Sequence, residues 1–237
     1  MKQQNKNHRI YIPCDIAVNQ TIKCDVSSSH HIKNVLRIKN TEDVILFNGD
    51  GKEYAGKVFH DDSTKISVFS FLRAIKINSR KISLAQCIPS SKYMDMAIQK
   101  SVELGIDQII PVISKRSHPG NHIKKLDHWK KIIIHATEQS NGLIIPKLHN
   151  VILFDDLLDK YTDSEDYKIC FHTAGRKLET KDKKHSNHIM LIGPEGGFTN
   201  DEVSLATKKS WNIVKLGDRI FRTETASIVA QTLLRDF

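Results

Sequence analysis

Two short glycine-containing turns near the C-terminus constrain this chain more than any other feature of its sequence. Residues 193–199 (Gly-Pro-Glu-Gly-Gly-Phe-Thr) follow an apolar, strand-like run at 188–192. Residues 216–226 (Leu-Gly-Asp-Arg-Ile-Phe-Arg-Thr-Glu-Thr-Ala) follow another at 211–216. Each turn leads into a segment with helical spacing. Two such corners in series place both turns at one edge of a sheet, where open α/β sheets bind their ligands. We therefore expect the functional site at these corners.

The bulk composition predicts an ordinary globular protein of the cytoplasm. A length of 237 residues suits one large domain or two small ones. The longest apolar runs are far shorter than the roughly 18 residues of a membrane span. The polar, basic start at residues 1–9 does not resemble a secretory signal. The four cysteines contain no C-x-x-C pair, so we expect reduced and mostly buried thiols.

Charge favours a polyanionic partner, and the histidines do not predict a metal site. Lys and Arg number 36 against 27 Asp and Glu, a net charge of +9. Such an excess suits phosphate-rich partners, although charge that only keeps the protein soluble would look the same. His118 and His122 have helical spacing, but Pro119 and Gly120 between them would break the helix that aligns their rings.

The pattern of elements changes near residue 72. Before it, short β-branched and aromatic runs predict strands, a turn at 48–51 predicts a hairpin, and 30–39 predicts a short helix. Several short strands in about 70 residues suggest a small β-barrel over 1–72. The predicted strands of this part are 9–12, 43–47, 53–58 and 65–69.

Residues 73–237 alternate between strand-like and helix-like segments, which is typical of an α/β fold with a mainly parallel sheet. The lysine-rich stretch 176–187 is expected to hang from this domain as a loop. The predicted strands are 81–88, 108–113, 167–171, 188–192 and 211–216, and the predicted helices are 91–104, 126–140 and 154–161.

The residues of the two corners indicate both local structure and chemistry. Gly196 and Gly197 allow positive φ and close approach of a ligand to the backbone. Thr199 with a glutamate three residues later predicts a capping box, and Thr223 is expected to cap the last helix. Tight turns without any ligand would have the same local sequence. Neither turn is a P-loop or a dinucleotide fingerprint.

Two arginines give the second corner its chemistry. Arg219 and Arg222 lie three residues apart, ahead of Glu224 in the first turn of the last helix. A guanidinium fork suits carbonyl and phosphate oxygens. We expect both arginines to reach over a ligand that the first corner also contacts.

At these residues the chain resembles a known family. Residues 193–198 together with 216–226 are similar to the C-terminal signature of the RsmE-type 16S rRNA uracil-N3-methyltransferases, members of the SPOUT class. Residues 8–12 resemble that family's opening strand, and 94–105 and 136–140 resemble its two middle motifs. The likeness covers the whole chain, with a phenylalanine at position 221 where leucine is more usual.

The resemblance implies a PUA-like barrel that binds RNA over 1–72 and a trefoil-knotted α/β methyltransferase domain over 73–237. It also implies S-adenosylmethionine as cofactor, a homodimer, no metal, and 16S rRNA or the assembled small ribosomal subunit as substrate. The residues that it implies around the cofactor are His172, Thr173, Leu191, Ile192, Gly193, Pro194, Glu195, Gly196, Gly197, Leu216, Gly217, Ile220, Thr223 and Ala226.

The implied reaction methylates N3 of one uridine, a nitrogen that must lose its proton to become a good nucleophile. We expect Arg222 and Arg219 as hydrogen-bond donors to the uracil oxygens and Glu224 as proton acceptor, with Glu195 and Glu138 as rivals. Basic side chains expected to contact RNA phosphates are Arg9, Arg37, Arg73, Lys76, Arg80, Lys115, Arg116, Lys124 and Lys125.

Three other readings stay open at this point. A SPOUT enzyme could methylate a ribose 2′-hydroxyl or a guanine instead. A protein with this fold could bind RNA as an assembly factor without catalysis. A phosphate-binding hydrolase could use the first corner, but the chain offers it no motif lysine, nucleophile pattern or metal site.

Overall fold

A computed structural model describes residues 8–76, 80–118, 120 and 123–235. The chain divides into two compact units. The first unit comprises the residues up to Ile77 together with Thr137–Ile145, and the second comprises Asn78–Ala136 and Pro146 onward. Within the described ranges, no helix is both long and apolar enough to span a membrane.

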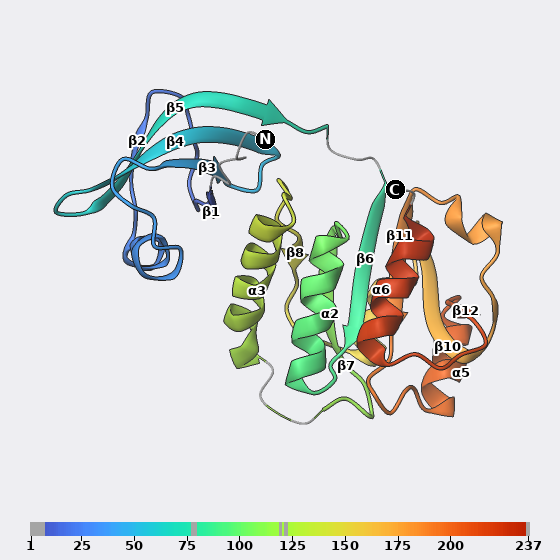
Figure 1. The fold of residues 1–237 in the computed structure, drawn as a ribbon. Coiled ribbons are helices and arrows are strands. Elements are labelled where there is room, and N and C mark those ends of the chain that lie inside the picture. The colour runs from blue at the N-terminus through green and yellow to red at the C-terminus, as the bar shows by residue number, and fades with distance from the viewer. Residues whose placement is uncertain (1–7, 77–79, 119, 121–122, 236–237) are drawn as a thin grey trace. The chain divides into compact units, whose positions relative to one another are not determined.

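The first unit is a five-stranded mixed sheet in the order β1-β3-β4-β5-β2 (Figure 1). β1 runs parallel to β3, and the other neighbours are antiparallel. The predicted turn at 48–51 does join β3 and β4 as a hairpin, with Leu46 opposite Tyr54. The strands are β1 (His8–Tyr11), β2 (Thr21–Lys23), β3 (Asp43–Phe47), β4 (Lys52–His60) and β5 (Thr64–Ala74).

The helical segment of the first unit lies earlier than the sequence predicts. It is α1 (Val26–His30) continued by one π-helical turn, η1 (His31–Val35), rather than a helix over 30–39. The reason is a cap: the carboxylate of Asp25 accepts a hydrogen bond from the backbone N–H of Ser28 at 2.6 Å, so the helix begins there.

Arg9 is a structural residue of the first unit, and the prediction that it contacts RNA is wrong. Its Nε donates to Glu53 Oε1 at 3.0 Å, and its two Nη atoms donate to the carbonyls of Glu138 and Gly142, each at 2.9 Å. The guanidinium also lies over the ring of Phe47, 4.7 Å from its centroid. The side chain is only 8% exposed, so its donors are used inside the unit and are not available to a phosphate. These bonds tie residues 137–145 to the first unit.

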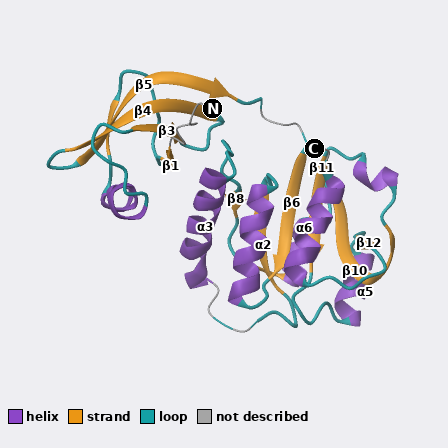
Figure 2. Cartoon of the chain, in the orientation of Figure 1, coloured by secondary structure: helices purple, strands orange, loops and turns teal. Residues whose placement is uncertain are grey.

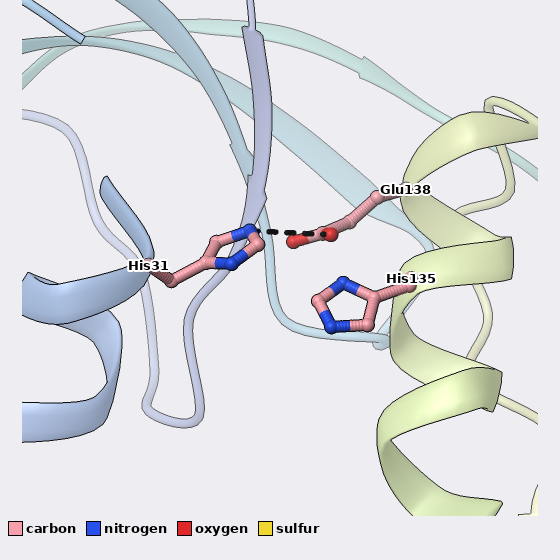
Figure 3. A group of neighbouring side chains, drawn as sticks. All are labelled: His31, His135 and Glu138. Carbon is pink, nitrogen blue, oxygen red and sulfur yellow. Dashed lines mark ion pairs between the residues drawn. The ribbon is translucent and has the colours of Figure 1, made fainter. Parts of the chain in front are cut away.

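Glu138, a rival for the role of proton acceptor, is also held inside this unit. It lies at the end of α3 (Leu126–Gln139), and its Oε1 accepts a hydrogen bond from the backbone of Tyr11 at 2.9 Å. Its Oε2 pairs with His31 Nε2 at 3.7 Å, the dashed contact of Figure 3, in which His135 precedes Glu138 by three residues on the helix. Both carboxylate oxygens therefore contact neighbouring residues of the first unit. Glu138 also lies in a different unit from the two corners.

The second unit is built on a sheet in the order β12-β10-β11-β6-β7-β8, with β9 also paired to β7, and all its described strand pairs are parallel. This confirms the predicted α/β fold. The trefoil knot that the resemblance implies stays a prediction. The strands are β6 (Lys81–Cys87), β7 (Gln108–Ile113), β8 (Lys147–Leu148), β9 (Ile152–Leu153), β10 (Tyr167–Lys177), β11 (Asn187–Ile192) and β12 (Asn212–Lys215).

Helices cover both faces of this sheet. α2 and α6 pack side by side on one face (Figures 1 and 2). On the other face, Leu157 of α4 and Ala206 of α5 join a core that contains Ile189 and Leu191 of β11. The helices are α2 (Ser91–Glu103), α3, α4 (Phe154–Lys160), α5 (Asn200–Lys208) and α6 (Thr223–Leu234), with short 3₁₀ turns η2 (Ile123–Lys125) and η3 (Thr180–Lys183).

The lysine-rich stretch 176–187 is packed onto the second unit, so the prediction of a hanging loop is wrong. β10 continues to Lys177, and η3 follows almost at once. Asp182 is fully buried, and its two carboxylate oxygens each accept a hydrogen bond from Arg176 at 2.7 Å. The hydroxyl of Tyr167 donates to the same carboxylate at 2.5 Å. One buried aspartate therefore anchors a segment whose composition is otherwise that of a loop.

We expect Asp182→Asn to destabilise the protein by about 1–3 kcal/mol at pH 7, because the change removes the negative charge and one of the two acceptor oxygens that Arg176 and Tyr167 share. Hydrogen bonds from Arg176 above all hold the pKa of Asp182 well below its ordinary value, even though burial opposes this. A lowered native pKa stabilises the fold above the unfolded-state pKa of about 3.9, and this stabilisation is lost as the pH falls further.

Urea unfolding at pH 7 and at successively lower pH measures this effect. The difference between wild type and Asp182→Asn should shrink below about pH 4. Asp163→Asn, at an exposed position in the same unit, is the control and should change little. A difference between wild type and Asp182→Asn that stays constant down to about pH 2 would contradict the assignment.

Candidate functional site

A pocket of about 600 Å³ opens at the carboxyl ends of β11 and β12 and beside the middle of β10, and we call it the corner pocket. Both predicted corners line it. The strands that precede the corners, β11 and β12, are labelled in Figure 2. It belongs entirely to the second unit. Its lining consists of Tyr93, Arg116, 171–173, 192–198, 215–217, 219–224 and Ala226.

The structure brings nearly all residues predicted at the corners to this pocket. The exception among the expected cofactor contacts is Leu191, which is fully buried in the core beneath α4 and α5. Alternate residues of a strand point to opposite faces of the sheet, so Ile192 reaches the pocket and Leu191 does not. The resemblance implied both Leu191 and Ile192 as cofactor contacts and took no account of this alternation.

The first corner is held by the predicted cap and by a neighbour that the sequence did not indicate. Thr199 caps α5 in a capping box with Glu202, as predicted: its Oγ1 accepts from Glu202 N at 3.2 Å and its N donates to Glu202 Oε2 at 2.8 Å. Arg116 Nη1 donates to the carbonyl of Gly196 at 2.7 Å. Gly197 has φ of +66°, and a Cβ built there would meet no atom within 4 Å. The capping box and Arg116 therefore hold the backbone of the first corner. At Gly197 this backbone has free space beside it.

The second corner is tied to the first through Thr223. The N-cap of α6 is Arg222, so the prediction that Thr223 occupies the cap is wrong. Instead, the Thr223 hydroxyl donates to the carbonyl of Gly193 at 2.5 Å and accepts from Gln86 Nε2 at 2.9 Å. Gln86 is fully buried on β6. Sequence reasoning missed it, although an amide inside the apolar strand 81–88 was a visible signal.

We expect Thr223→Val to destabilise the protein by about 1–3 kcal/mol, because the Gln86 amide and the Gly193 carbonyl would lose a buried partner at nearly constant volume. Urea unfolding measures this difference. Thr225→Val is the matched control, two residues later on the same helix and only half-buried. Equal effects at the two positions would show that the loss comes from replacing any hydroxyl of α6 with a methyl group and not from the link between the corners.

The charged groups of the corner pocket differ in their surroundings. Arg219 and Arg222 are exposed, and within the described part of the chain neither forms an ion pair. Glu224 is only 6% exposed, and its Oε2 has no hydrogen-bond partner among the described residues. The corner pocket thus combines two exposed guanidinium groups with one buried carboxylate oxygen that has no hydrogen-bond partner among the described residues.

Glu195 also lines the corner pocket, but its carboxylate is already in use. Its Oε1 accepts a hydrogen bond from the backbone N–H of Ser90 at 2.9 Å. Burial alone would raise the pKa of Glu195, but hydrogen bonds led by that from Ser90 lower the pKa overall. A carboxylate with a lowered pKa is a weak base, which counts against Glu195 as proton acceptor.

The basic residues predicted to contact RNA are dispersed over both units. In the first unit, Arg37 is exposed, and Arg73 is about half exposed while it pairs with Glu53 at 2.7 Å. In the second, Lys115 is exposed near Asp201, and Arg80 donates a hydrogen bond to the carbonyl of Lys183. Lys76 and Lys124 are exposed, and Lys125 donates to Ser91 Oγ. Of the predicted histidine pair, His122 lies outside the described residues.

Comparison with known proteins agrees with this arrangement. The sequence model for an RNA methyltransferase domain matches residues 76–235, and that for an RNA methyltransferase PUA domain matches residues 25–69. The chain is 33% identical to the ribosomal RNA small subunit methyltransferase E of Buchnera aphidicola from Acyrthosiphon pisum, over 99% of this chain and 97% of that one. It is 34% identical to the Mesomycoplasma hyopneumoniae protein of the same name, over 86% and 88% of the two chains.

Two solved structures share the whole fold. A methyltransferase from Legionella pneumophila, determined with bound S-adenosylmethionine, has a TM-score of 0.89 and 31% identity over 97% of each chain. The ribosomal RNA small subunit methyltransferase E of Neisseria gonorrhoeae, also bound to S-adenosylmethionine, has a TM-score of 0.87 and 33% identity over 96% of each chain. The present chain therefore belongs to the ribosomal RNA small subunit methyltransferase E family, with a PUA domain and an α/β methyltransferase domain.

Proposed function

We propose that this protein transfers a methyl group from S-adenosylmethionine to N3 of one uridine in 16S rRNA. The observation that carries the proposal is the corner pocket, a cavity of about 600 Å³ that both predicted corners line. That volume lies within the range of pockets that hold a nucleoside-sized ligand. Relatives over the full length of the chain carry the name of this rRNA methyltransferase, and two structural neighbours hold the same cofactor.

The residues of the corner pocket fit S-adenosylmethionine. The space above Gly197, where even a Cβ would meet nothing, lets a ligand approach the backbone. Pro194, Leu216 and Ile220 offer apolar walls for a nucleoside. The unpartnered Glu224 Oε2 suits a ligand that brings a positive charge or a proton. We assign cofactor contacts to the predicted residues that line the pocket, without Leu191.

Bound there, the cofactor would supply an electrophilic methyl group. The protein's own residues would do the remaining work. Arg222 and Arg219 would donate hydrogen bonds to the uracil oxygens, and so stabilise the negative charge that develops when N3 loses its proton. Glu224 would accept that proton at its free oxygen. Tyr93 and the two arginines lie on the pocket lining, where they would meet an incoming base.

The proposal assigns RNA binding to residues 1–72 and methyl transfer to residues 73–237. It places the protein in the cytoplasm, where 16S rRNA or the assembled small subunit is available. It includes a homodimer, which is supported by Ile220: this side chain is 84% exposed at the pocket rim, and apolar groups so exposed favour a protein partner.

The test is transfer of a labelled methyl group from S-adenosylmethionine to small ribosomal subunits from a strain that lacks the activity. The modified nucleoside is then identified by mass mapping. We expect N3-methyluridine at a single position. Label on a ribose or a guanine would overturn the target. Cofactor binding without any transfer would identify an RNA-binding assembly factor.

A further inference from the structure

The methyltransferase domain has a second pocket, which we call the basic pocket. It lies at the amino ends of strands of the sheet, at the opposite strand ends from the corner pocket. It has a volume of about 410 Å³ and is lined by Arg80, Thr180, Lys183, Lys184, His185 and Ser186. Three of these side chains are cationic, the other three can donate hydrogen bonds, and none is a carboxylate. A lining made only of donors suits an anion with several oxygens, such as a phosphate group.

The segment that carries this pocket is held in place. The imidazole of His185 stacks on the ring of Tyr167, with centroids 4.0 Å apart and planes 10° from parallel. Arg80 donates a hydrogen bond to the carbonyl of Lys183. Asp182, between the pocket's threonine and its lysines, is buried under Arg176 and Tyr167. The lysines are thus presented from an anchored turn, which spares a ligand part of the cost of ordering them.

The two lysines of the pocket, Lys183 and Lys184, carry the part of its charge that the proposal uses. The buried carboxylate of Asp182 nearby is already neutralised by the guanidinium of Arg176. Within the described part of the chain, Lys183 and Lys184 form no ion pair, whereas neighbouring Lys181 pairs with Glu179 at 2.9 Å. Burial lowers the pKa of His188, and Arg80 and His185 nearby act in the same direction, whereas the hydrogen bond with Asp182 and the carboxylate of Asp166 act against it.

The position of the basic pocket decides which phosphate it would bind. Arg80 precedes β6 and Ser186 precedes β11, so the pocket lies at the amino ends of these two strands, and the carboxyl end of β11 lines the corner pocket. β11 has six residues, which at about 3.3 Å each separate the two sites by roughly 17–20 Å. A group bound there cannot be part of the cofactor or the target nucleotide in the corner pocket.

We propose that the basic pocket binds a backbone phosphate of the RNA substrate, several nucleotides away from the target uridine. This rests on the proposed function, because it extends the RNA contact of the same methyltransferase. The pocket would grip the chain without reading its sequence, and would add a binding point on the methyltransferase domain to whatever the PUA domain supplies.

The test compares two double variants that remove the same charge. Lys183→Gln with Lys184→Gln changes the pocket, and Lys181→Gln with Lys208→Gln changes exposed lysines of the same domain outside both pockets. The probe is a fluorescein-labelled single-stranded RNA of about 20 nucleotides, enough to span both sites. Its dissociation constant is measured by fluorescence anisotropy over a series of salt concentrations.

We expect the pocket variant to bind the probe about fivefold or more weakly than the control. We also expect the slope of log affinity against log salt to fall by about 0.7 for each phosphate that the variant no longer neutralises. Equal affinities and slopes in the two variants would overturn the proposal. A second result would also overturn it: inorganic phosphate binds the wild type but not the pocket variant, and the two proteins bind RNA with equal affinity. The basic pocket would then bind a small free anion and not RNA.

Calorimetric titration with S-adenosylmethionine separates this proposal from the proposed function. Both double variants should bind the cofactor as the wild type does, because their substitutions lie outside the corner pocket. If the wild type does not bind the cofactor, the proposed function fails whatever the RNA measurements give. If cofactor binding is intact and the two variants bind RNA alike, only the basic pocket loses its assignment.

Discussion

Arg222→Ala is expected to lower the rate of methyl transfer by about 10²–10³-fold, the effect of removing one hydrogen-bond donor from a developing oxyanion. The affinity for S-adenosylmethionine should change by no more than several-fold. The guanidinium is exposed at the N-cap of α6 and lines the corner pocket, so it can reach an incoming base without supporting the fold. Single-turnover transfer to small subunits and calorimetry with the cofactor measure the two quantities separately.

Two further variants sharpen this result. Arg222→Lys keeps the charge but loses the two-pronged donor, and should recover only part of the activity. Lys208→Ala removes an exposed cation on α5 away from the pocket, and should leave transfer nearly unchanged. If Arg222→Ala instead abolishes cofactor binding, the arginine belongs to the cofactor site, and its role toward uracil is wrong.

Glu224→Gln is expected to reduce methyl transfer by about 10²–10⁴-fold, the usual contribution of a general base. The substitution keeps the size of a buried side chain and removes only its ability to take a proton at the free Oε2. Stability should stay close to that of the wild type, since Oε2 has no partner among the described residues to lose. Single-turnover transfer at saturating cofactor isolates the chemical step.

Glu195→Gln is the matched control for this prediction, because it makes the same chemical change on the same pocket lining. Since Glu195 already accepts a hydrogen bond from Ser90, we expect it to alter transfer far less than Glu224→Gln. The reverse order would make Glu195 the proton acceptor. A large loss of cofactor affinity in Glu224→Gln, with transfer intact at saturation, would mean that the carboxylate holds a positive group of the cofactor.

Several features of the fold and the site followed from local sequence. The two corners follow apolar strand segments, and the Thr199–Glu202 capping box needs only residues three apart, so both could be predicted. The same holds for the hairpin at 48–51. In these cases one short segment contains both the residues that interact and the geometry that brings them together.

The errors came from partners that are distant in sequence. Arg9 looked like a surface cation, but its donors bind Glu53 and carbonyls in the last turn of α3 and just after that helix. Thr223 had the sequence of a cap, but a carbonyl thirty positions earlier takes its hydroxyl. The stretch 176–187 had the composition of a loop, but the single carboxylate of Asp182 anchors it. No local pattern announces such a partner.

The sequence by itself determined the alternation of strands and helices, the two corners, and the chemical groups placed on them, because backbone preferences and side-chain spacing act over a few residues. Only the tertiary structure decided which charged groups are used up inside and which stay free for a ligand. Arg9 and Arg222 are the same residue type, yet one is buried among acceptors and the other is exposed at a pocket. That difference depends on what the fold packs around each guanidinium, since its donors bind whichever acceptors the packing brings within reach.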